Sequence, residues 1–165
     1  MPSSQTRTLE TLMLETLKDI YHAEKQVLRA LPKMAKAAKS EELRKALETH
    51  RQETEGQIER LEKVFESMDR AARGKPCEAM QGLVAEGQEI LEEFSDSEAL
   101  DAGIVAANQS IEHYEISRYG TLRTWAQQLG MEEAARIFEQ NLEEEKKTDE
   151  LLTQLAEAKA NKKAA

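Results

Sequence analysis

The sequence has few residues that interrupt helices and few aromatic side chains. Its 165 residues include three prolines and seven glycines, and aromatic residues make up only 4%. Alanine, leucine, glutamate, lysine and glutamine dominate instead, and these are good helix formers. The length suits one compact domain and is too short for two comfortable ones. The composition therefore predicts a single all-α domain that packs mainly through aliphatic side chains.

Cysteine is nearly absent, since Cys77 is the only one in the chain. A single cysteine cannot form an intramolecular disulfide, and such low usage suits a reducing compartment. The N-terminus carries no secretory apolar region, and no apolar run approaches the roughly 18 residues that a membrane-spanning helix needs. We therefore expect a cytoplasmic protein without membrane contact.

A basic surface is lacking too, because the net charge is −9. Nucleic-acid binding needs a basic patch, so we expect no nucleic-acid partner. No glycine-rich phosphate loop or nucleophile–base set is present, which argues against a nucleotide enzyme or a hydrolase. The lysine-containing end, "KANKKAA", is expected to be a disordered tail, because chain ends are usually loose. The predicted domain is then residues 1–158, and the tail is residues 159–165.

Apolar residues recur at steps of three and four in four long runs, as they do in amphipathic helices. The runs extend over residues 9–35, 43–68, 100–129 and 134–155. Ser40 is a predicted N-cap with acidic residues following it, and Gly130 is a predicted helix stop. Because these two breaks are short, each should join antiparallel neighbours.

The segment between the two predicted hairpins is longer. "ARGKPCEAM" breaks the apolar pattern, and Pro76 is placed in the first turn of a shorter helix that reaches about Phe94. Ser97 or Asp96 would then cap the next long helix. This segment must carry the chain from one hairpin to the other. The prediction is an antiparallel four-helix bundle with a short extra helix in one long crossover.

Each long run has a gap in its apolar stripe, and each gap holds a residue type that binds metals. These residues are Glu24 in the first run, His50 and Glu53 in the second, Glu112 and Glu115 in the third, and Glu145 and Asp149 in the last. Residues three or four apart share a helix face, so all four sets should point inward. An isolated buried carboxylate is costly, or takes up a proton. Four sets together call for a shared compensating charge.

The spacing within each predicted hairpin brings these sets to one level. Glu24 and Glu53 are 29 residues apart, and Glu115 and Glu145 are 30 apart, with a turn near the middle of each interval. Cations bridged by carboxylates would balance such a cluster of acids. The pattern therefore predicts a metal site.

Other interpretations of single residues stay open. One inward glutamate is often at a bundle edge with its head in water, and one histidine is often a hydrogen-bonded core residue. The acids could also pair with nearby basic residues, namely Lys25, Arg29 or Arg118. His22 and His113 should face outward, roughly 200° round the helix from Glu24 and Glu115. Tyr21 and Tyr119 lie one turn from those glutamates, where they could hydrogen-bond ligand carboxylates or simply pack at the core edge.

Five segments of the chain resemble the motifs of a known family. They are "DIYHAEKQ", "HRQETEGQIERLE", "CEAMQGLVAEG", "IEHYEISRYGTL" and "LEEEKKTDELLTQL", and the likeness runs from about residue 9 to 156. The chain resembles the YciF-like, stress-associated ferritin-like (rubrerythrin-like) proteins. The resemblance implies a ferritin-like bundle, homodimers and a di-iron centre. By motif, the implied metal ligands are Glu24, His50, Glu53, Glu115, Glu145 and Asp149, with Glu112 in reserve. Glu86 of the crossover helix matches a motif position but receives no ligand role.

The motifs depart from the general di-iron pattern of one glutamate from each of two helices and Glu-x-x-His from each of the others. The second helix has His50-x-x-Glu53, the reverse order, and the last has Glu145-x-x-x-Asp149 without a histidine. A site rich in carboxylates with one imidazole suits Fe or Mn better than Zn or Cu. We therefore expect two Fe or Mn ions per chain.

Three functions are compatible with the sequence. The first is a redox di-metal protein, a rubrerythrin-like peroxidase or oxidase that consumes peroxide or oxygen under stress with electrons from a donor protein. The second is iron binding or storage at the same site. The third is a metal-free helical adaptor or stress-protection protein that acts through dimerisation or protein contacts.

Overall fold

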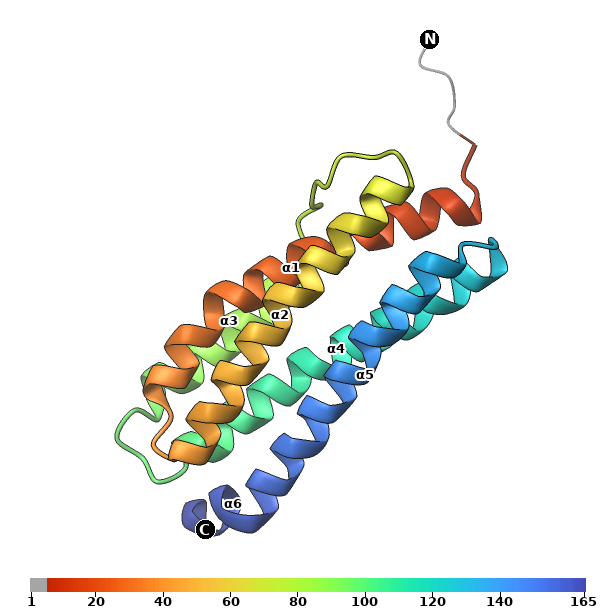
Figure 1. Cartoon of the computed structure of the whole chain (residues 1–165). Helices are drawn as coiled ribbons and strands as arrows, with labels where there is room; N and C mark the ends of the chain where they lie inside the picture. Colours follow the sequence, from red (N-terminus) through yellow and green to blue (C-terminus); the bar gives the residue numbers. More distant parts are fainter. Residues whose placement is uncertain (1–5) are drawn as a thin grey trace.

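The computed structural model describes residues 6–165 and consists of helices joined by turns. In chain order these are α1 (Leu9–Ala37), α2 (Glu41–Ser67), α3 (Glu78–Glu93), α4 (Leu100–Gln128), α5 (Glu132–Leu155), the π-helical turn η1 (Ala156–Ala160) and α6 (Asn161–Ala164). Figure 1 shows the four long helices α1, α2, α4 and α5 running along one another. The predicted antiparallel four-helix bundle with a short crossover helix is confirmed.

Both predicted hairpins are present. The Ser40 hydroxyl accepts a hydrogen bond from the Leu43 N–H at 3.4 Å, which makes Ser40 the N-cap of α2. Asp101 of α4 fixes the same turn, because its carboxylate accepts the Lys39 N–H and the Ser40 N–H, each at 2.8 Å. In the second hairpin Gly130 has a φ of 72°, a left-handed conformation that glycine adopts without strain. This glycine lets α5 begin soon after α4 ends.

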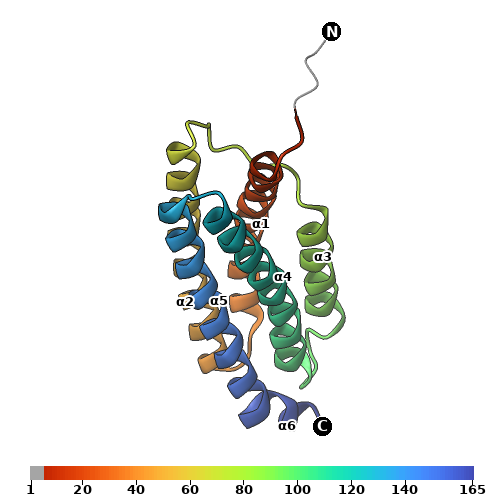
Figure 2. The same cartoon turned by 90° about the vertical axis from the view of Figure 1, so that its right-hand side faces the viewer.

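The crossover places α3 outside the four-helix core. Figure 2 shows α3 flanking the bundle, where it packs against α1 and α4. Two predicted helix starts are wrong in detail. Pro76 precedes the N-cap of α3, which is Cys77, and therefore lies outside the first turn. α4 begins later than predicted, at Leu100, and the Ser97 hydroxyl accepts from the Ala99 N–H in the turn before it.

The end of the chain is more ordered than its sequence predicts. Residues 156–164 continue as η1 and α6, where a disordered tail was expected from residue 159. The reason is local: Ala156 and Ala160 are buried, and Lys159 Nζ forms an ion pair with Glu42 Oε1 of α2 at 2.6 Å. These contacts fold the end of the chain against the base of the bundle, as Figure 1 shows.

The bundle core is apolar at both ends. Towards the end that holds the α4–α5 turn, the buried residues include Leu17, Leu61, Leu122 and Phe138, and towards the other end they include Leu31, Leu47, Ile104 and Leu152. Between these layers lies a band of buried polar side chains. No helix within residues 6–165 is both long enough and apolar enough to cross a membrane.

Candidate metal centre

Five side chains with ligand atoms meet in the middle of the bundle. Glu24 of α1, His50 of α2, Glu112 and Glu115 of α4, and Glu145 of α5 are each at most 1% exposed. They form two groups of three, in each of which one ligand atom per residue lies within 4.8 Å of the others. One group is His50, Glu112 and Glu145, and the other is Glu24, Glu115 and Glu145. Glu145 belongs to both, so the arrangement has two halves with one shared carboxylate.

The helical period of the flanking apolar residues forces these acids inward. Glu24 lies between Ile20 and Val27, which are both fully buried, and Glu115 lies between Ile111 and Leu122 on the same face of α4. A helix that buries these neighbours must also bury the residue between them. The apolar layers thus determine where the carboxylates point.

Almost all of the ligand atoms are free of protein hydrogen bonds. The four glutamates offer eight carboxylate oxygens, and only Glu24 Oε1 has a partner, the Tyr119 hydroxyl at 2.5 Å. The other seven oxygens and both ring nitrogens of His50 find no hydrogen-bond partner within the described chain. Buried polar groups in native proteins are nearly always satisfied. A cluster with this many free lone pairs is arranged as a set of metal ligands would be.

One contact within the cluster has the spacing of two ligands on one ion. His50 Nε2 lies 2.8 Å from Glu112 Oε1, yet the geometry does not make it a hydrogen bond. Two neighbouring ligands of an octahedral ion, each about 2.1 Å from the metal, are separated by about 3 Å. The imidazole and the carboxylate therefore approach each other as they would around a shared cation.

The electrostatics of the cluster, without a cation, disfavour the charged form of its acids. Burial raises the pKa of Glu24, Glu115 and Glu145 well above the usual value, and the neighbouring carboxylates raise each of them further. Burial also raises the pKa of Glu112, to about 8. The pKa of Tyr119 is raised as well, by burial and by Glu24, so its hydroxyl remains a donor. Without a cation, the cluster is stable only if it holds protons.

The basic residues considered as partners for these acids lie elsewhere. Lys25 Nζ sits 4.3 Å above the Tyr21 ring, Arg29 Nε donates to the Lys25 carbonyl, and Arg118 Nε donates to the Tyr114 hydroxyl. None of the ion pairs formed among residues 6–165 joins a lysine or arginine to the four glutamates. Charge pairing with lysine or arginine does not explain their burial, and His50 is the one basic side chain within residues 6–165 that contacts them.

Two of the predicted ligands lie outside both groups. Glu53 is half-buried and accepts a hydrogen bond from the Thr148 hydroxyl at 3.2 Å. Asp149 is also half-buried and lies 3.1 Å from His113 Nε2. A step of three or four residues rotates a side chain by about 40–60° round the helix. The sequence stripe cannot resolve that rotation, whereas the structure shows that Glu112, held in reserve, is in the cluster and these two are not.

Of the predictions for the two tyrosines and the two outward-facing histidines, one of each pair agrees fully with the structure. Tyr119 bonds to Glu24 as one interpretation expected, but the Tyr21 hydroxyl donates to Glu62 at 2.9 Å and has no contact with the cluster. His113 is exposed, as predicted. His22 is only half-exposed, because its Nδ1 accepts the Cys77 N–H at 3.1 Å and so secures the crossover.

Sequence reasoning missed the buried amides near the cluster. Gln57 of α2, Asn108 of α4 and Asn141 of α5 are fully buried. Asn108 lies four residues before Glu112, and Asn141 four before Glu145, so the same helical spacing could have identified them. They were overlooked because only ionisable residues were sought in the stripes.

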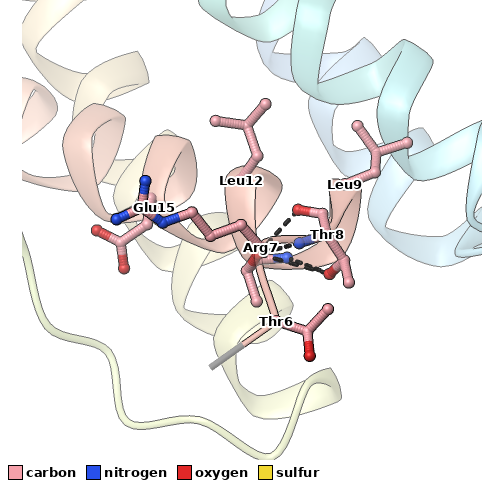
Figure 3. Close-up of a pocket in the computed structure, with 7 residues that line it drawn as sticks. Thr6, Arg7, Thr8, Leu9, Leu12 and Glu15 are labelled. Carbon is pink, nitrogen blue, oxygen red and sulfur yellow. Dashed lines mark hydrogen bonds between the residues drawn. The ribbon is translucent and has the colours of Figure 1, made fainter. Parts of the chain in front are cut away.

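The hollow drawn in Figure 3 lies apart from this centre. It opens at the start of α1, where its lining runs from Thr6 to Glu15 and includes the half-exposed Leu12. The Thr8 hydroxyl accepts the Thr11 N–H there at 3.2 Å, which caps the helix. None of the five cluster residues lines this hollow.

Comparison with known proteins identifies the family. The profile of the family described as a domain of unknown function (DUF892) matches residues 8–165. The chain belongs to this family. It is 46% identical over 159 residues to the protein YciF of Escherichia coli (strain K12), and the match covers 96% of each sequence. The resemblance to YciF-like proteins that the five segments indicated is confirmed.

Solved structures of similar proteins agree with the fold. The E. coli stress protein YciF matches with a TM-score of 0.90 and 46% identity, over 95% of this chain and 99% of that one. YcfI of Rhodopseudomonas palustris matches with a TM-score of 0.88 and 44% identity, over 93% and 98%. A protein of Xanthomonas campestris pv. campestris, 24% identical with a TM-score of 0.72, supports the fold alone.

Proposed function

We propose that the chain is a ferritin-like di-metal protein whose centre binds two Fe or Mn ions and reduces peroxide or oxygen under stress. The observation that carries the proposal is the pair of three-residue groups that share Glu145, with seven carboxylate oxygens and two imidazole nitrogens left free within residues 6–165. The relative YciF is named a stress protein, which supports the physiological setting.

The donor set fits these metals. His50 and Glu112 would hold one ion, Glu24 and Glu115 would hold the other, and Glu145 would bridge them. Carboxylate oxygens with a single imidazole are a donor set for Fe or Mn, whereas structural Zn sites favour thiolate and imidazole. The bound metals would supply the electron-transfer steps that reduce the oxidant.

The protein's own residues would prepare the site for those ions. The Tyr119 hydroxyl holds one oxygen of Glu24 and leaves the other free. The apolar layers above and below exclude bulk water. Because the buried acids would hold protons in the absence of a cation, metal binding must release them, and this makes binding stronger as pH rises.

The setting of the protein also belongs to this proposal. Homodimers follow from the family resemblance, an electron-donor protein follows from the redox role, and a cytoplasmic location agrees with the single cysteine, which suits a reducing compartment. Iron binding without turnover would use the same five residues. The alternative to both metal-binding functions is the metal-free adaptor. Leu12 and Leu151, which are 50% and 41% exposed, could provide its apolar contacts.

Elemental analysis separates the proposal from the adaptor. The protein is purified without chelators or affinity metals, and the metal content per chain is measured for the native chain and for Glu24→Ala. About two Fe or Mn ions per chain, reduced in the variant, support the di-metal centre. A metal-free native chain, even after anaerobic reconstitution with Fe²⁺ or Mn²⁺, supports the adaptor. Peroxide turnover by the loaded protein then distinguishes a redox role from iron binding.

A further inference from the structure

Two buried amide side chains lie beside the candidate centre and have no part in it. Gln57 of α2 and Asn141 of α5 are both 0% exposed. Within residues 6–165, neither Oε1 nor Nε2 of Gln57 finds a hydrogen-bond partner, and Nδ2 of Asn141 finds none either. Buried amides without partners are costly, so the fold retains here polar atoms that its own residues leave unsatisfied.

Both amides share a helix face with a residue of the cluster, Asn141 one turn and Gln57 two turns along its helix. Gln57 follows His50 by seven residues, or two turns on one face, and its side chain leans toward the N-terminal end of α2, where His50 lies. Asn141 precedes Glu145 by four residues on α5. Glu145 in turn leans back over the turn that contains Asn141. Asn141 therefore adjoins the cluster carboxylate Glu145 on one face of α5.

Arg60 shows that the two amide-bearing stretches are neighbours, and it closes them off from solvent. Its Nε donates to Asn141 Oδ1 at 2.7 Å, and its Nη2 bonds to Glu144 of α5. Gln57 lies three residues before Arg60, on the same face of α2. The Arg60 and Glu144 side chains are 18% and 21% exposed, so this pair lies between the buried amides and the surface.

The amide atoms of Gln57 and Asn141 that have no partner determine which kind of molecule could bind to them. Gln57 provides one NH2 donor group and one acceptor oxygen, and Asn141 provides a second NH2 donor group. An anion would be repelled by the neighbouring carboxylates, and a cation would not accept from the two amide N–H groups. A molecule that both accepts and donates hydrogen bonds fits, whereas dioxygen, which donates none, has nothing to give to Oε1.

We propose that Gln57 and Asn141 form a hydrogen-bonding subsite for a small neutral hydroxylic molecule, hydrogen peroxide or the water that it displaces, beside the metal centre. The subsite deepens the proposed function and rests on it. It makes peroxide the oxidant that the protein binds before reduction. Gln57 is then a positioning residue for the oxidant rather than a metal ligand.

The test compares two oxidants on one loaded protein. Native protein and the Gln57→Met variant, which keeps side-chain length and helix propensity, are loaded anaerobically with Fe²⁺ and their iron content is measured. Each is then mixed with hydrogen peroxide or with dissolved oxygen in a stopped-flow instrument, and iron oxidation is followed by absorbance. Loss of one hydrogen bond should weaken peroxide binding by about tenfold. We expect the half-saturating peroxide concentration to rise accordingly and the oxygen rate to stay unchanged.

Two further variants keep the test decisive if Gln57→Met folds poorly. Asn141→Leu removes the second donor and should also slow the peroxide reaction alone. Asn108→Leu is the matched control, because Asn108 is a fully buried amide one turn before Glu112 that offers no free donor: its Nδ2 is already bonded to the Ile104 carbonyl and Met34 Sδ, and only its Oδ1 has no partner within residues 6–165. It should leave the relative rates of the two oxidants unchanged.

A second readout does not depend on turnover. Because the Gln57 amide is unsatisfied in the metal-free chain, the thermal midpoint of apo Gln57→Met should equal or exceed that of the native protein. With iron content intact, equal slowing with both oxidants, or no slowing with either, overturns the subsite and leaves the di-metal centre standing. A native protein that binds no iron overturns the centre itself, and the subsite with it.

Discussion

The shared carboxylate gives the sharpest prediction. Replacing Glu145 by methionine removes the ligand common to both three-residue groups, so binding of both ions should be lost. The same change should stabilise the metal-free protein. Glu145 is fully buried, its pKa is raised well above the usual value by burial and then by Glu112, and neither carboxylate oxygen has a hydrogen-bond partner among residues 6–165.

The magnitude follows from those observations. An unsatisfied buried polar group costs about 1–3 kcal/mol, so apo Glu145→Met should be more stable than the apo native chain by about that amount. For a domain of this size each kcal/mol moves the melting midpoint by about 2–4 °C. Metal at about 100 times its dissociation constant should raise the free energy of unfolding of the native chain by about 2.7 kcal/mol. The variant should gain none.

Thermal unfolding with and without Mn²⁺ measures both effects on one pair of proteins. Glu53→Met is the matched control, since Glu53 is a half-buried glutamate that bonds to Thr148 outside both groups. It should keep the metal-dependent gain. If Mn²⁺ stabilises Glu145→Met as much as the native chain, or if the apo variant is several kcal/mol less stable, then Glu145 is a structural residue and the reasoning is wrong.

Three other perturbations follow from single contacts. As pH rises from the ordinary glutamate pKa of 4.5 to about 8, the apo protein should lose stability, because folded Glu112 holds its proton in that window and the unfolded chain does not. Glu112→Gln should make the free energy of unfolding, measured with urea, depend less on pH. Tyr119→Phe removes the donor to Glu24 and should weaken metal binding by about tenfold or more in a titration. Asp101→Ala removes two charge-assisted bonds to the α1–α2 turn and should lower the free energy of unfolding by about 2–4 kcal/mol.

The Tyr119 and Asp101 variants each have a control within the chain. Tyr21→Phe removes a buried hydroxyl that bonds to Glu62, and it should leave metal affinity unchanged. Asp96→Ala removes an exposed acid near the start of α4 and should hardly change the urea midpoint. A flat pH profile for the native apo chain would contradict the argument from buried, protonated glutamates, and equal metal affinity in the two tyrosine variants would contradict a role for Tyr119.

The sequence contained enough information for the fold. The period of the apolar residues located the four long helices, and Ser40 and Gly130 marked turns that the structure contains. The helical end of the chain could not be predicted, because the Lys159–Glu42 ion pair that holds it joins residues 117 apart in sequence. A contact of that kind leaves no local pattern.

The sequence predicted which face of each helix carries the candidate site, but not which residues of that face contribute to it. The four acidic or histidine gaps identified the correct helices, yet the stripe could not separate Glu112, which lies in the cluster, from Glu53 and Asp149, which lie outside it. The partner of the Tyr21 hydroxyl could not be predicted from the sequence either, because a side chain one helical turn from Glu24 can contact either of two neighbouring groups. Gln57 and Asn141 were missed because uncharged residues in an apolar stripe look like ordinary packing.

The single imidazole makes the two halves of the centre chemically unequal. One half has His50 with Glu112, and the other has Glu24 with Glu115, so the second half carries one more negative charge when all acids are ionised. The more anionic half should hold a trivalent ion more tightly and give it the lower reduction potential. Mössbauer spectra of an iron-loaded protein should then resolve two quadrupole doublets of equal area, and partial oxidation should convert one of them before the other.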